Sequence, residues 1–316
     1  MVEAKLGCLA FMIVHAISSS LVSEIEREIA SQPACWREAS GVAPSVEALL
    51  PAGGERVAVV GCGTSWFVAQ AYASLREAGD AGETDAFTAS EMPDGRAYDR
   101  VVAISRSGTT TEVERLLAGI GGARRTTAIC GVADTPIANA ADDRIILGFA
   151  DERSVVQTRF ATSTLALLRA HLREDLEPVA RDGESALEAE LPLDPGAFDH
   201  FVFLGRGWTI GLANEAALKL REAATAWSES YPAMEYRHGP ISVAGPRSAV
   251  WPLGDVDAEL LADVTATGAT VVDAGVGAID PMAELILIQR TAVALAQHRG
   301  LDPDRPRHLT RSVVLS

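Results

Sequence analysis

The strongest constraint on the fold is a pattern that occurs twice in the chain, 144 positions apart. Each copy begins with a short β-branched and apolar run, ends that run at Gly-x-Gly, and continues into an alanine-rich stretch typical of a helix. The glycines are Gly61 and Gly63 in the first copy and Gly205 and Gly207 in the second. A repeated unit of strand, tight turn and helix predicts an α/β protein built from two similar halves.

Strand and helix patterns alternate after each copy. We expect strands near 84–88, 100–105, 125–130 and 143–148 and helices near 110–121 and 154–175, then strands near 248–253 and 269–274 and a helix near 281–298. Buried strands that alternate with helices form parallel sheets with helices on both faces. The sequence therefore predicts two doubly wound parallel-sheet domains in tandem, with ligands at the carboxyl ends of the strands.

Composition sets the predicted domain boundaries. Residues 1–45 are expected to form an N-terminal arm and helix, 46–180 the first domain and 198–316 the second. The stretch 181–197 is polar and carries prolines near its end, so we interpret it as the linker.

Charge and cysteine usage exclude several classes of function. The 316 residues carry a net charge of −16, which leaves no basic stripe to bind nucleic acid. An anionic ligand would have to be held locally, by backbone amides and a few cations. The scattered cysteines show neither disulfide nor zinc spacing, which is typical of a reducing cytoplasm; they are Cys8, Cys35, Cys62 and Cys130. We expect no bound metal.

The apolar run 6–17 resembles a targeting segment. It is too short to span a bilayer, Lys5 alone supplies positive charge before it, and no clear small-residue cleavage site follows. We expect a packed N-terminal arm on a cytoplasmic protein without membrane contact. A secretory signal is the alternative, and Met12 is a second candidate start.

One predicted strand ends in a concentration of hydroxyl groups. The apolar run Val101–Ile104 leads directly into Ser105–Thr111, which contains five hydroxyl residues and Gly108, and a helix pattern follows from Glu112. A loop of this kind directs hydroxyls and backbone N–H groups at one point, near the positive end of a helix dipole. The loop therefore predicts a phosphate site.

Neither Gly-x-Gly fits a dinucleotide fingerprint. Trp66 and Ile210 stand where the third glycine belongs, and no acidic residue is clearly placed about twenty positions on. The serines and threonines suit a monophosphate better, so we expect no nicotinamide or flavin cofactor.

Taken in order, these motifs resemble the sugar isomerase (SIS) family, whose domains are flavodoxin-like. The likeness is greatest to the tandem isomerase domain of glucosamine-6-phosphate synthase and to stand-alone phosphosugar deaminases and fructosamine-6-phosphate deglycases. It covers nearly the whole chain from about residue 30. It rests on segments 61–65, 105–110, 155–159, 204–207, 215–222, 235–240 and 303–307.

The resemblance implies which residues hold the substrate. Hydroxyls of the first domain would bind the sugar phosphate, with Arg106 in the same loop and Gln157 where the synthase has a serine that contacts the sugar. The implied hydroxyl residues are Thr64, Ser65, Ser105, Ser107 and Thr110. For any one of them, the alternative is a helix cap.

The resemblance also implies the catalytic residues. Glu222 matches a general base that moves a proton between C1 and C2 of the open-chain sugar, and Lys219 would neutralise the developing enolate charge. The two residues are three apart on one helix, so a surface ion pair is the alternative. His238 matches a ring-opening acid and base that reaches the site of a neighbouring subunit, which implies a homodimer.

Two departures from the synthase narrow the reaction. Arg311 stands where the synthase has a lysine that engages the sugar carbonyl, and a guanidinium forms no Schiff base. The glutaminase domain is absent from this sequence. We therefore expect an isomerase or deaminase of an amino sugar 6-phosphate, with glucosamine 6-phosphate as the first guess. A fructosamine-6-phosphate deglycase and a non-catalytic phosphosugar sensor are the alternatives.

Overall fold

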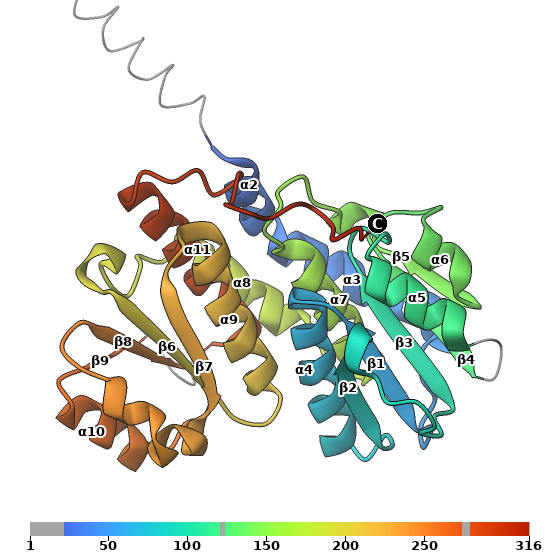
Figure 1. The fold of residues 1–316 in the computed structure, drawn as a ribbon, viewed down its shortest axis with the longest axis horizontal. Helices are drawn as coiled ribbons and strands as arrows, with labels where there is room; N and C mark the ends of the chain where they lie inside the picture. Colours follow the sequence, from blue (N-terminus) through green and yellow to red (C-terminus); the bar gives the residue numbers. More distant parts are fainter. Residues whose placement is uncertain (1–21, 121–123, 274–278, 316) are drawn as a thin grey trace, which may run out of the picture.

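The computed structural model describes residues 22–120, 124–273 and 279–315, and its strands form two parallel sheets (Figure 1). The first sheet has the order β2-β1-β3-β4-β5, with β1 Val57–Gly61, β2 Thr84–Thr88, β3 Arg100–Ser105, β4 Arg125–Cys130 and β5 Asp143–Ile146. The second has the order β7-β6-β8-β9, with β6 His200–Gly205, β7 Trp227–Pro232, β8 Ser248–Pro252 and β9 Thr270–Val271. The predicted α/β fold with two parallel sheets is confirmed.

Helices cover both faces of each sheet. The α-helices are α2 Glu24–Ala30, α3 Gln32–Val46, α4 Thr64–Ala78, α5 Thr111–Ile120, α6 Pro136–Ala140, α7 Arg159–His171, α8 Glu177–Glu188, α9 Thr209–Ala224, α10 Ala258–Ala266 and α11 Pro281–His298. One continuous core joins both sheets to α3, α4, α7, α9 and α11. Two smaller cores lie beyond the sheets, one under α5 and α6 and one under α10.

The alternation of strand side chains explains this layering. All five residues of β1 are buried. Val57 and Val59 point into the large shared core, whereas Ala58 and Val60 point to the outer core under α5. A strand with apolar side chains on both faces is stable only when helices cover both sides, so the sheet is parallel and doubly wound.

Helices α4 and α9 pack against each other between the two sheets, and residues 144 positions apart meet there. Asn214 Nδ2 donates a hydrogen bond to Gln70 Oε1 at 2.7 Å. A Cβ added to Gly211 would lie 2.5 Å from the carbonyl oxygen of Phe67, so the glycine allows the two backbones to touch. The repeat seen in the sequence is therefore also a packing relation between equivalent residues.

The first part of the expected linker, 181–197, is helical, because residues 177–188 form helix α8. Small buried residues give α8 a face that packs on α3 and α11, namely Val179, Ala180, Gly183 and Ala186. At Gly183 a Cβ would lie 2.7 Å from the Trp36 ring, so the glycine serves packing rather than chain flexibility. The helix expected at 154–175 is shorter than predicted, and residues 151–158 precede it as a loop.

The expected arm at 6–17 lies outside the described residues. Within the described ranges, the helices are either too short or too polar to cross a membrane.

Candidate active site

The hydroxyl loop, Ser105–Thr110, joins the end of β3 to the start of α5. Ser105 and Ser107 turn their hydroxyls inward, where Ser105 Oγ accepts the amide of Gly108 and Ser107 Oγ accepts the amide of Thr109, each at 3.2 Å. Ser105 Oγ lies 3.5 Å from Thr110 Oγ1. Gly108 has φ +66°, and a Cβ added there would lie 2.0 Å from Thr135 Oγ1, so no other residue fits this turn. The result is a tight loop with its hydroxyls clustered at the carboxyl end of the sheet.

A second hydroxyl pair lies on the neighbouring strand. β1 pairs with β3, so the loop after β1 reaches the same edge of the sheet. Thr64 and Ser65 begin α4 there, and each side chain is buried. Gly61 allows this sharp turn, because a Cβ would lie 2.7 Å from the backbone of Ser65. The structure thus brings both predicted hydroxyl groups to one end of the first sheet.

The C-terminal segment, residues 309–315, crosses from the second half and covers the hydroxyl loop (Figure 1). Ser312 Oγ lies 3.1 Å from Ser107 Oγ and 3.0 Å from Thr109 Oγ1. The amide of Thr111 donates to Val313 O at 3.2 Å, so the segment also occupies the first turn of α5. Ser312 is a further candidate site residue, which sequence reasoning missed although it directly follows the predicted Arg311.

Lys219 and Glu222 lie together on α9 and form more than a surface ion pair. Lys219 is 1% exposed, and its Nζ lies 2.7 Å from Glu222 Oε2 and 3.3 Å from Glu215 Oε1. The same Nζ donates to Thr64 Oγ1 at 3.2 Å, which joins α9 to the start of α4. The ammonium therefore lies at the junction of the two halves, between two carboxylates.

Glu215 was missed by sequence reasoning. It lies one helical turn before Lys219 and is 3% exposed. The signal was present, because an acidic residue at i−4 from a lysine shares its face. Burial raises the pKa of Glu215 to about 7, against the lowering effect of Lys219 and with a further rise from Glu222. Burial opposes the charge on Lys219, yet the two carboxylates outweigh it, so the pKa of Lys219 is raised.

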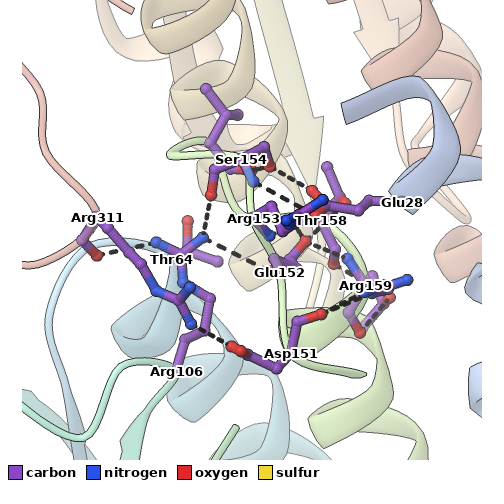
Figure 2. A network of polar contacts seen from close by, with 12 residues as sticks. Glu28, Thr64, Arg106, Asp151, Glu152, Arg153, Ser154, Thr158, Arg159 and Arg311 are labelled. Carbon is purple, nitrogen blue, oxygen red and sulfur yellow. Dashed lines mark hydrogen bonds and ion pairs between the residues drawn. The ribbon is translucent and has the colours of Figure 1, made fainter. Parts of the chain in front are cut away.

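Among the described residues, the guanidinium of Arg106 forms no hydrogen bond to the hydroxyl groups of the loop. Its side chain is buried, and Nη1 donates to Ser154 O at 2.8 Å and Nη2 donates to Arg311 O at 2.9 Å (Figure 2). Glu152 Oε2 lies 3.8 Å from Nη1 as the counter-charge. The predicted direct contact between Arg106 and the ligand finds no support in this orientation.

The two remaining predicted sugar contacts flank this network. Arg311 forms an ion pair with Asp151, which ties the C-terminal segment to the 151–158 loop (Figure 2). Gln157 lies in that loop and is half-buried, and its Oε1 is buried without a hydrogen-bond partner among the described residues. An unpaired buried amide oxygen is costly, so a bound hydroxyl or amine donor would satisfy it.

His238 lies apart from the other predicted residues. It ends the 3₁₀ helix η5, Ala233–His238, and its side chain is exposed. In the part of the chain that the structure describes, no hydrogen bond or ion pair joins His238 to Glu222, Lys219 or the hydroxyl loop. Within the same ranges, no group of three or more His, Cys, Asp or Glu side chains could hold a metal ion.

Comparison with known proteins finds relatives that are named as aminotransferases or deaminases of sugar phosphates. No protein-family model matches the chain. The isomerizing glutamine–fructose-6-phosphate aminotransferase of Methanothermobacter thermautotrophicus is 28% identical over 326 aligned positions, which cover 89% of this chain and 54% of that protein. The chain thus spans about half the length of the curated relatives that it matches, 54% and 50% for two of them.

Two solved structures share the fold over most of the chain. The crystal structure of glucosamine-6-phosphate deaminase from Thermotoga maritima matches with a TM-score of 0.79 and 25% identity, covering 93% of this chain and 100% of that one. The C-terminal domain of glucosamine-fructose-6-phosphate aminotransferase from Francisella tularensis matches with a TM-score of 0.78 and 21% identity, covering 91% and 99%. By sequence, the chain is homologous to the isomerase (SIS) domain of glutamine–fructose-6-phosphate aminotransferases.

Proposed function

We propose that this chain is a phosphosugar aldose–ketose isomerase or deaminase, with glucosamine 6-phosphate as its first candidate substrate. The observation that carries the proposal is the cluster at the junction of the two halves. A fully buried lysine lies between two carboxylates and contacts a hydroxyl of the first sheet. The similarity to a glucosamine-6-phosphate deaminase supports the same reaction class.

The first half, 46–180, would bind the phosphate. Hydroxyls suit this task because the chain carries a net charge of −16, which makes a long-range cationic field unavailable. The candidate donors all lie at the carboxyl ends of β1 and β3: Thr64, Ser65, Ser105, Ser107 and Thr110. Gln157 and Arg311 would face the sugar from the 151–158 loop and the C-terminal segment.

The second half, 198–316, would supply the acid–base chemistry. Glu222 is the partly accessible carboxylate of the cluster, with 20% of its side chain exposed, so it is the member able to reach a substrate. It would remove the proton from C2 of the open-chain aldehyde and return it to C1. Lys219, next to it at 2.7 Å, would balance the charge of the enediolate or enolamine between these steps.

Deamination completes the same sequence with water. Return of the proton to C1 of the enolamine leaves a protonated imine at C2. Addition of water to that carbon and loss of ammonia then give fructose 6-phosphate. We propose that His238 opens the sugar ring in the site of a second copy, because its exposed position on η5 leaves it free to enter a neighbouring subunit.

The test is turnover of glucosamine 6-phosphate by the purified chain, with ammonia and fructose 6-phosphate measured together. Glu222→Gln should lose at least about 100-fold in kcat and keep substrate affinity, because a positioned general base contributes a factor of that order. Glu259→Gln, an exposed carboxylate on α10, is the matched control and should keep full activity. Equal turnover in the two variants would contradict the role of Glu222.

A further inference from the structure

Arg106 lies where three chain segments meet. It belongs to the hydroxyl loop, its Nη1 bonds to Ser154 O in the 151–158 loop, and its Nη2 bonds to Arg311 O in the C-terminal segment (Figure 2). These three segments line the candidate site. Arg106 is 2% exposed, so the position of its guanidinium is set by the protein and not by solvent.

Among the described residues, Glu152 is the carboxylate that forms an ion pair with the buried Arg106. Glu152 is 0% exposed, and one of its oxygens is occupied by the protein, since Oε1 accepts the amide and hydroxyl of Thr158 at 2.6 and 2.7 Å. The other oxygen, Oε2, has no hydrogen bond among the described residues and faces Arg106 at 3.8 Å. A second buried carboxylate, Glu28 of α2, accepts the Ser154 hydroxyl and amide next to them.

We propose that Arg106 is a positioning residue, which holds the C-terminal segment over the hydroxyl loop through its fork between Ser154 O and Arg311 O. The effect of Arg106 on catalysis rests on the proposed function. Its structural part, the dependence of the C-terminal segment on Arg106, stands without that function. The competing interpretation is a phosphate ligand, for which Nε is the one donor without a partner among the described residues.

Arg106→Lys separates these two roles. A lysine keeps the positive charge beside Glu152, so the buried carboxylate stays compensated and the fold is retained. It has a single nitrogen on a flexible stem and cannot bridge two carbonyls as the planar guanidinium does. The double variant Arg106→Gln with Glu152→Gln removes both charges of the pair and serves as the second test. Arg153→Lys, 82% exposed in the same loop, is the matched control.

The first readout is amide hydrogen exchange of the free protein. The amide of Thr111 donates to Val313 O, and the amide of Leu315 donates to Thr111 Oγ1 at 2.9 Å. Exchange of both amides therefore reports whether the C-terminal segment lies over the hydroxyl loop. In Arg106→Lys and in the double variant we expect both to exchange about tenfold faster, as the loss of one such hydrogen bond implies. Arg153→Lys should leave them unchanged. Unchanged exchange in Arg106→Lys would overturn the proposal.

The second readout is steady-state kinetics with glucosamine 6-phosphate. In Arg106→Lys the displaced C-terminal segment should raise KM severalfold and leave kcat little changed. The substrate would lose contacts with the C-terminal segment, whereas the proposed general base Glu222 would stay in place. The opposite result has two parts: Arg106→Lys keeps the KM of the parent protein, and the double variant is no longer stabilised against thermal unfolding by inorganic phosphate. That result would show that Arg106 is a phosphate ligand, and the proposal would be wrong. The exchange experiment needs no substrate, so it decides the positioning role even if no sugar phosphate is turned over.

Discussion

Replacing Lys219 by methionine tests whether the cluster on α9 is one electrostatic unit. Methionine has a similar length and packs without charge, so the change removes the ammonium and leaves the space filled. The lysine is 1% exposed and Glu215 is 3% exposed. Without Lys219, Glu215 is a buried carboxylate with no cation beside it, whereas Glu222 still reaches solvent through the exposed fifth of its side chain.

The size of the effect follows from this burial. Breaking a buried ion pair by removing one partner costs about 3–5 kcal/mol, most of it for the charge left behind. The loss should grow with pH, because Lys219 now lowers the pKa of Glu215 and its removal raises that pKa further. The folded variant then keeps a proton that the unfolded chain releases, so its stability falls as pH rises above the ordinary glutamate value.

Urea unfolding at about pH 5 and pH 8 measures both parts of the prediction. Lys219→Met should lose more stability at the higher pH. Adding Glu215→Gln removes the stranded carboxylate and should return the protein to within about 1–2 kcal/mol of the parent. A single variant within about 1 kcal/mol of the parent, or a double variant no more stable than the single, would refute the account of the cluster as a buried ion triad.

Two further predictions concern stability away from the candidate site. Burial raises the pKa of Glu284 to about 7, so the folded chain holds a proton between about pH 4.5 and 7 that the unfolded chain releases, and stability falls across that window as pH rises. Glu284→Gln should flatten this part of the pH profile in urea unfolding, and an unaltered slope would contradict it. Gly211→Ala should destabilise by about 1–3 kcal/mol, because the new Cβ would lie 2.5 Å from Phe67 O and 2.8 Å from Ala71 N. Gly41→Ala, in open space on helix α3, is its control and should stabilise by about 0.5–1 kcal/mol in thermal unfolding; a loss at Gly41 equal to that at Gly211 would exclude the steric explanation.

The parallel sheets were predictable because their signals are local. A run such as β1 is apolar on both faces and ends in the glycine that the next turn requires, so pattern alone indicates a buried strand followed by a helix. Helix α8 was not recognised because its buried face is made of small residues. Its role depends on Trp36, more than 140 positions earlier, which fits against Gly183.

The candidate site also has some features that the sequence predicts and others that depend on partners distant in the sequence. The hydroxyl loop follows from the local sequence pattern, whereas Lys219 and Glu222 were singled out by the resemblance to the sugar isomerase family, because their spacing alone also fits a surface ion pair. The orientation of Arg106 could not be predicted from the sequence, because an arginine between two serines gives the same sequence pattern whether its side chain faces a ligand or the protein interior. Its direction is set by Glu152 and by the carbonyl of Arg311, and these partners come together only in the folded chain.

The contact between α4 and α9 bears on how many ligands one chain can hold. Helix α9 carries Glu215, Lys219 and Glu222, whereas the residues 144 positions earlier on α4 are the uncharged Ala71, Leu75 and Ala78. Trp208 stands 144 positions after Thr64, and the Arg169 guanidinium lies 4.9 Å from the centre of the Trp208 ring. The proposed acid–base cluster therefore has no charged counterpart at the positions on α4 that the repeat relates to it, so a titration should saturate at one sugar phosphate per chain.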